Sequence, residues 1–182
     1  LATLARSGVD RNVWAACLHW YCARVDLLYF SFVTEWLFPA YEDGVYEVRS
    51  ADVVPIVQKT YLAEAGKSLT EHRTTRAARD LLRMAAEFGL LSGFGVRRFE
   101  PYCLPDEAFL FLLHTMAEMK MRVNTIIDSA DWRIFLMDSD DVERELLRLH
   151  QYRELHYEVA GTLRQLQLPC ETAIAYVRRL GA

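Results

Sequence analysis

The sequence contains little glycine and proline and has no long run free of charge. Among its 182 residues there are eight Gly and five Pro, a composition that argues against collagen-like and largely disordered chains. The most apolar stretch, VDLLYFSFVTEWLFPAY, includes Glu35 and Pro39 and is shorter than the ~20 apolar residues that a membrane-spanning helix requires. We therefore expect a folded protein that is not anchored in a membrane.

Cysteine is also scarce, and none of the four lies in a CxxC motif. The five-residue spacing of Cys17 and Cys22 separates them by about 140° around a helix, which is unfavourable for a shared metal. His19, one turn from Cys22, is the nearest imidazole that could join a zinc site, but no HxxxH motif supplies further ligands. We expect buried, reduced thiols, with no metal and no cofactor.

The N-terminal residues LATLARSGVDRN lack the basic region and apolar run of a signal peptide. The first residue is Leu and not Met, which indicates a fragment. Together with the expectation of reduced thiols, this pattern favours a cytoplasmic protein.

Patterns typical of catalysis are few. Gly66-Lys67-Ser68 resembles the end of a phosphate-binding loop, but Tyr61 stands where the first Gly is needed. Gly93-Phe94-Gly95 follows an expected helix and precedes an expected strand, which is the wrong order for a dinucleotide fingerprint. His150 and His156 have no suitably spaced carboxylate, and GxSxG is absent. We predict a protein that is not an enzyme and takes no small-molecule substrate.

The densest acidic cluster comprises Asp138, Asp140, Asp141, Glu143 and Glu145. Such carboxylates could hold a divalent ion, but no Gly occupies the position that a calcium loop requires. Acidic side chains also stabilise a helix N-terminus, where the partial charge is positive. We interpret the cluster as the start of a helix.

Apolar residues make up 52% of the chain and include nine Phe, nine Tyr and four Trp, which predicts a large aromatic core. From Asn12 to about Phe38 they cover nearly every side of a helix, so we expect one or two buried helices ended by Pro39. The following segment, AYEDGVYEVRS, is predicted to contain a turn and a short extended piece.

Two consecutive helices have the outline of a helix-turn-helix. The first is predicted to begin at Ser50 or Asp52 and to end at Gly66; the second follows a capping-box spacing of Ser68 and Glu71 and ends at Gly89. About three residues join them. Gly93 and Gly95 are then expected to close a small hairpin within residues 90–99, which would form a wing.

The C-terminal part repeats this order of helices and a hairpin. Apolar helices are predicted after residues 105 and 140, a hairpin within 155–168, and a last helix in CETAIAYVRRL. The fold class is therefore mainly α, a compact helical domain with helix-turn-helix or winged-helix-like elements and small β-hairpins. We expect one lobe over residues 1–104 and another over 105–182, packed as one compact unit.

The segment 67–98 is basic in an acidic chain. It contains seven Lys or Arg and three acidic residues, whereas the formal charge of the chain is −4. At about 100° per residue, three arginines lie within about 60° of each other and opposite Ala77, Leu81, Ala85 and Phe88. The residues expected to bind nucleic acid are Lys67, Thr70, Arg73, Thr74, Arg76, Arg79, Arg83, Arg97 and Arg98. The alternative is a solvated face that Asp80 and Glu87 partly neutralise.

The segments TTRAARDLLRMAAEFGLL, IIDSADWRIFLMDSDDVERELLRLH and LHYEVAGTLRQL together resemble the BrxA family of bacteriophage-exclusion (BREX) defence systems. The resemblance covers residues 12–168 and implies a mainly helical, cytoplasmic protein similar in fold to the antitermination factor NusB. It also implies a nucleic-acid-binding accessory component that acts with other BREX defence proteins, without a reaction of its own. The region that usually precedes the helix starting near Asn12 is shortened here.

Two functions of different classes are consistent with these features. The first is a non-enzymatic accessory protein that binds double-stranded DNA with low sequence specificity through the phosphates. The second is a protein-interaction scaffold of the defence complex, without direct nucleic-acid binding, whose basic helix docks an acidic partner. Exposed Trp and Tyr side chains would favour the second function, because aromatic residues are typical of protein interfaces.

Overall fold

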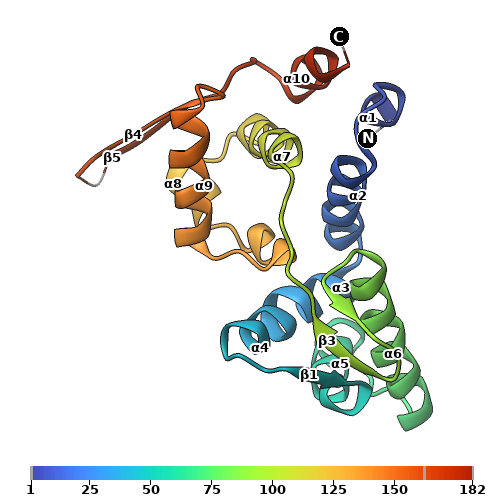
Figure 1. Cartoon of the computed structure of the whole chain (residues 1–182). Coiled ribbons are helices and arrows are strands. Elements are labelled where there is room, and N and C mark those ends of the chain that lie inside the picture. Colours follow the sequence, from blue (N-terminus) through green and yellow to red (C-terminus); the bar gives the residue numbers. More distant parts are fainter. Residues whose placement is uncertain (1, 162, 182) are drawn as a thin grey trace. The chain divides into compact units, whose positions relative to one another are not determined.

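The computed structural model describes residues 2–161 and 163–181 (Figure 1). The chain divides into two units. The central unit comprises His19–Cys103 and Arg133–Leu136, and the terminal unit comprises Leu1–Leu18, Leu104–Trp132 and Met137–Ala182. The chain thus crosses between the units at residue 104, where the sequence suggests a boundary. It also crosses at residues 18, 132 and 136, so each unit is built from separate stretches of the chain.

Both units are mainly helical and contain small antiparallel strand pairs, which confirms the predicted fold class. The central unit contains α3 (Leu27–Phe32), the π-helix η1 (Val33–Leu37), α4 (Phe38–Glu42), β1 (Glu47–Arg49), α5 (Ser50–Ala65), α6 (Glu71–Glu87), β2 (Leu91–Ser92) and β3 (Val96–Phe99); α2 (Arg11–Val25) begins in the terminal unit and ends in this one. Within the described residues, no helix is both long enough and apolar enough to cross a membrane.

Pro39 does not end the first buried helices, as the sequence suggested. The chain continues in helical form through α4, with Pro39 near its start. The wider π turn before it explains this, because the amide of Phe38 donates to the carbonyl of Val33 five residues earlier. The hydrogen-bond pattern changes just before the residue that has no N–H to donate, so the proline is accommodated.

The helices α5 and α6 pack against each other and form the predicted helix-turn-helix. Gly66 ends α5 in the left-handed conformation at φ 62°, as expected for this residue. The connection is longer than predicted, because α6 begins at Glu71 with Thr70 as its N-cap residue. The capping box expected from Ser68 is therefore absent from the described structure of this helix start.

Three strands follow the order β1-β3-β2, in which β1 packs against α5 and β2 against α6 (Figure 1). The hairpin β2–β3 confirms the predicted wing, with Gly93 and Gly95 at positive φ in its turn. The extended piece after residue 45 is β1, which pairs with β3 in the register Glu47↔Arg98. The sequence did not indicate this pairing, because β1 and β3 are separated by the whole helix-turn-helix.

The terminal unit contains the second predicted hairpin and the last predicted helix. Its elements are α1 (Ala2–Arg6), α7 (Asp106–Glu118), α8 (Val123–Ile127), the start of the 3-10 helix η2 (Ala130–Phe135), α9 (Ser139–Gln151), β4 (His156–Ala160), β5 (Leu163–Gln167) and α10 (Ala173–Leu180). The strands β4 and β5 pair antiparallel, and β4 packs beside α9 (Figure 1).

The acidic cluster is a helix start, as predicted. Asp138 caps α9 and accepts a hydrogen bond from the amide of Asp141 at 2.7 Å, while Asp141 accepts one from the amide of Asp138 at 3.1 Å. Glu143 instead accepts bonds from the hydroxyl of Tyr157 at 2.6 Å and from the guanidinium of Arg164 at 3.0 Å. These carboxylates therefore have protein partners that account for their positions.

Candidate nucleic-acid interface

Helix α6 presents the predicted arginine stripe to solvent. Leu81 and Ala85 are buried on its other side, and Phe88, just after its end, packs against His19. Arg76, Arg79 and Arg83 are all exposed. The facing predicted from the helical period is confirmed, because burial of the apolar side forces the opposite side outward.

The residues at the start of α6 divide into exposed and buried side chains. Lys67, Thr70 and Arg73 are exposed and accessible to a ligand. The prediction that Thr74 binds nucleic acid is wrong. Its side chain is fully buried and its hydroxyl donates to the carbonyl of Thr70 at 3.0 Å. A hydroxyl at this position bonds back to the preceding turn and is withdrawn from the surface.

Asp80 partly neutralises the stripe, as the alternative interpretation anticipated. Arg83 lies 2.8 Å from Asp80, and Arg76 lies 4.0 Å from the same carboxylate. The two arginine side chains are 64% and 79% exposed, and ion pairs this exposed contribute only ~0–1 kcal/mol. A phosphate that offers a bidentate partner can therefore replace Asp80 at little cost.

Other basic side chains of the predicted set have no such partner. Within the described part of the chain, neither Lys67, Arg73 nor Arg79 forms an ion pair. Arg79 occupies the middle of the stripe, between Arg76 and Arg83 along α6. The centre of this surface thus keeps an uncompensated positive charge although the chain as a whole is acidic.

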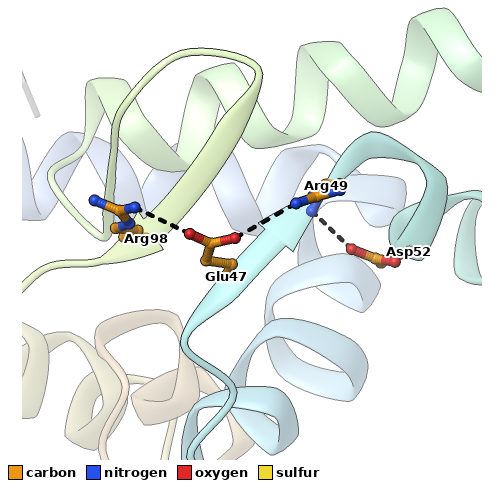
Figure 2. A network of polar contacts seen from close by, with 4 residues as sticks. All are labelled: Glu47, Arg49, Asp52 and Arg98. Carbon is orange, nitrogen blue, oxygen red and sulfur yellow. Dashed lines mark hydrogen bonds and ion pairs between the residues drawn. The ribbon is translucent and has the colours of Figure 1, made fainter.

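The two wing arginines are not equivalent, although the sequence grouped them. Arg97 lines a groove together with the α6 arginines, whereas Arg98 is not among its lining residues. Adjacent residues of a strand point to opposite faces, which explains the separation. Figure 2 shows the Arg98 guanidinium directed at Glu47 on β1, at a distance of 3.0 Å. Arg98 also lies 5.3 Å from the centre of the Tyr46 ring.

The contact with Glu47 favours the charged form of both partners. The hydrogen bond from Arg98 holds the pKa of the Glu47 carboxyl below its usual value, and the same bond raises the pKa of Arg98. Glu47 also lies 3.5 Å from Arg49, whose amide donates to Asp52 at the start of α5 (Figure 2). Arg98 therefore belongs to a paired network on the sheet, whereas Arg97 lines the groove.

A groove lies between α6 and the wing. It has a volume of about 520 Å³, and its basic lining residues are Arg76, Arg79, Arg83 and Arg97. Phe94 and Gly95 of the wing turn complete one side, and Ser50 lies at the start of α5. A second hollow of about 610 Å³ continues along the same helix, lined by His72, Thr75, Arg76 and Arg79 together with Glu71. Guanidinium groups in this arrangement can hold successive phosphates.

Two members of this surface were not identified from the sequence. The sequence predicts only a turn position for Phe94 and only a helix-cap role for Ser50. A hydrophobic residue between two glycines in a short turn cannot pack beneath its own hairpin, so the Gly-Phe-Gly pattern contained a signal for an exposed ring. Ser50 could not be found in this way, because only the folding of β1 onto β3 brings it close to the groove.

The described residues contain no group of three or more His, Cys, Asp or Glu side chains arranged to hold a metal ion. Comparisons of this chain with protein-family models, with curated proteins and with solved structures found no match. The arrangement of arginines on α6 and the wing is therefore the main observation that bears on function.

Proposed function

We propose that this chain is a non-enzymatic, cytoplasmic accessory protein that binds double-stranded DNA in a bacterial anti-phage defence system of the BREX type. The observation that carries DNA binding is the convergence of Arg76, Arg79 and Arg83 with Arg97 on one groove. The defence role, and the partnership with other BREX proteins, rest on the sequence resemblance to the BrxA family.

The proposed contacts are made mainly to phosphates. Helix α6 is the second helix of a helix-turn-helix, the element that approaches the DNA groove in proteins with this motif. Its exposed ridge presents arginines and lacks the Asn and Gln residues that typically read base edges. Binding of this kind is electrostatic and shows little sequence preference.

The test replaces the three stripe arginines together, as Arg76→Ala, Arg79→Ala and Arg83→Ala. Anisotropy titrations of a labelled duplex at several salt concentrations would give the slope of log affinity against log salt. Each phosphate contact contributes about 0.9 to the magnitude of this slope. The slope of the triple variant should therefore be smaller by about 3, and the variant should bind the duplex more weakly. Circular dichroism would first establish that the variant retains its helical signal.

A matched control removes the same charge elsewhere, as Arg144→Ala, Arg178→Ala and Arg179→Ala, from exposed positions of α9 and α10. This variant should keep the slope of the parent, because its net charge changes equally but the stripe is intact. Equal slopes for the parent and the stripe variant would show that α6 is not part of the DNA-binding surface. Absence of DNA binding by the parent at low salt would contradict the proposed function.

A protein-interaction scaffold is the second candidate, favoured by exposed aromatic side chains. Tyr46 is 70% exposed and Tyr152 is 69% exposed. The tryptophans, however, give this function no support, because two are buried and two are half-buried. The scaffold becomes the better explanation if the parent does not bind DNA at low salt.

A further inference from the structure

Phe94 is the most exposed of the large apolar side chains in the described structure, at 97% of its surface. It occupies the tip of the wing, between the ends of β2 and β3. Full exposure of a phenyl ring is unfavourable in water, and nothing in the fold of the wing requires an aromatic residue there.

The turn holds this ring outward by means of its backbone. Gly93 and Gly95 have φ values of 88° and 77°, which other residues rarely adopt. The amide of Val96 donates to the carbonyl of Phe94 at 2.9 Å, and the guanidinium of Arg97 donates to the carbonyl of Gly93. The position of the ring is thus defined by a tight turn that one of the groove arginines supports.

The surroundings of Phe94 are strongly basic. Four arginines line the same groove, and Asp80 is the one acidic residue among its described lining residues. Of the four, neither Arg79 nor Arg97 forms an ion pair in the described chain. A ligand that fits here must offer negative charge to the guanidinium groups and a flat apolar face to the ring.

A nucleotide with an unstacked base meets both requirements. Aromatic side chains beside a basic groove stack on unpaired bases while the cations hold the adjoining phosphates. In a continuous duplex each base already stacks on its neighbours, so its face is not available to Phe94. At a gap, one or more bases lack a partner and can stack on the ring. An acidic protein segment would satisfy the arginines but supplies a flat partner only through its own aromatic residues.

We propose that Phe94 stacks on an unpaired base and directs this protein to duplex DNA that contains a single-stranded gap. This inference rests on the proposed DNA binding and specifies the DNA structure that the same groove recognises. The arginines supply affinity for any duplex, and the ring supplies the preference for the gapped one.

The experiment compares two labelled duplexes of equal length, one fully paired and one with a two-nucleotide gap. The proteins are the parent, Phe94→Ala, Phe94→Trp and the control Leu163→Ala. Leu163 is a suitable control because it is an apolar residue, 68% exposed, at the start of β5 in the other hairpin. Thermal midpoints would be measured first, and we expect all four to agree closely because both positions are exposed.

The parent should bind the gapped duplex at least about 5-fold more tightly than the paired one. Phe94→Ala should lose about 5- to 150-fold in affinity for the gapped duplex, since a stacked base contributes that range. Its salt slope should stay close to that of the parent because the substitution removes no charge, and its preference for the gapped duplex should be lost. Phe94→Trp should keep the preference, and Leu163→Ala should behave as the parent.

Equal affinity of the parent for both duplexes would overturn the stacking role while leaving the proposed DNA binding intact. A preference that persists in Phe94→Ala would overturn it as well. Failure of the parent to bind either duplex would instead contradict the proposed function, and the stacking role with it. In that event, binding of an acidic, tyrosine-containing peptide that weakens in Phe94→Ala would identify a protein as the partner of this surface.

Discussion

His19 links the stability of the central unit to pH. Its ring is fully buried, lies 2.8 Å from the hydroxyl of Tyr29 through Nε2, and stacks on Phe88 with ring centres 4.2 Å apart. Burial lowers the pKa of His19 to about 3. At a pH between the usual pKa of 6.5 and this lowered pKa, His19 binds a proton in the unfolded chain but not in the folded chain. Stability is therefore fully present above pH 6.5 and is lost as the pH falls toward 3.

Replacing His19 by Phe should remove this contribution to acid sensitivity. Near pH 7.5 the variant should be less stable by ~1–3 kcal/mol, because the Tyr29 hydroxyl loses its buried partner. Below pH 6.5 the difference should shrink by up to about 1.4 kcal/mol per pH unit, because only the parent must exclude a proton from His19. Urea unfolding of the parent and the variant at four pH values between about 7.5 and 4.5 would measure this difference in the free energy of unfolding.

His72→Phe is the control for this experiment, since His72 is exposed on α6 and meets water in both states. The free energy of unfolding of this variant should differ from that of the parent by no more than ~0.5 kcal/mol, because the side chain is exposed. A constant free-energy difference between the parent and His19→Phe at all four pH values would contradict the assignment of a buried neutral imidazole.

At the scale of elements, α6 is held by its apolar side. Leu81→Ala should lower the free energy of unfolding by about 2–5 kcal/mol, because it removes a buried side chain and leaves a cavity. Arg79→Ala on the exposed side should change it by no more than ~0.5 kcal/mol. Denaturant titrations of both variants test the orientation of the helix. If Leu81→Ala were as stable as Arg79→Ala, the orientation and the binding surface that depends on it would both be wrong.

The wing turn depends more on Gly93 than on Gly95. A Cβ at Gly93 would lie 2.7 Å from the carbonyl oxygen of Val96, whereas a Cβ at Gly95 has no neighbour within 4 Å. Gly95→Ala should therefore cost only the ~1–2 kcal/mol of a positive φ, and Gly93→Ala should cost more. Urea unfolding compares the two variants directly. Equal losses would show that the turn relaxes freely and does not fix the position of Phe94.

We expect neither a bound metal nor catalytic turnover in this protein. The carboxylates that could attract a cation already have protein partners. Asp138 and Asp141 form the capping box of α9, and Glu143 accepts hydrogen bonds from Tyr157 and Arg164. Elemental analysis should find less than stoichiometric metal, and nuclease and nucleotide-hydrolysis assays should show no activity. One equivalent of zinc or magnesium, or turnover that disappears in Glu143→Gln, would contradict this expectation.

The local elements of this protein follow from its sequence because their causes lie within a few residues. The helical period of α6 determines which side carries arginine, Gly66 and Gly89 determine where helices end, and Asp138 begins α9. Pro39 and Thr74 depart from what their neighbouring residues predict. The π turn before Pro39 lets the helix continue, and the bond from the Thr74 hydroxyl to Thr70 withdraws that side chain from the surface. Residue type alone does not specify either hydrogen bond.

Contacts between distant segments were decided only by the tertiary structure. The pairing of β1 with β3 joins residues about fifty positions apart, and it places Glu47 against Arg98 while Arg97 faces the groove. The division of the chain into units likewise joins its first residues to its last. A charge pattern could identify the basic segment, but not which of its cations are paired. Pairing depends on three-dimensional proximity, which arises only when separate apolar surfaces are buried together.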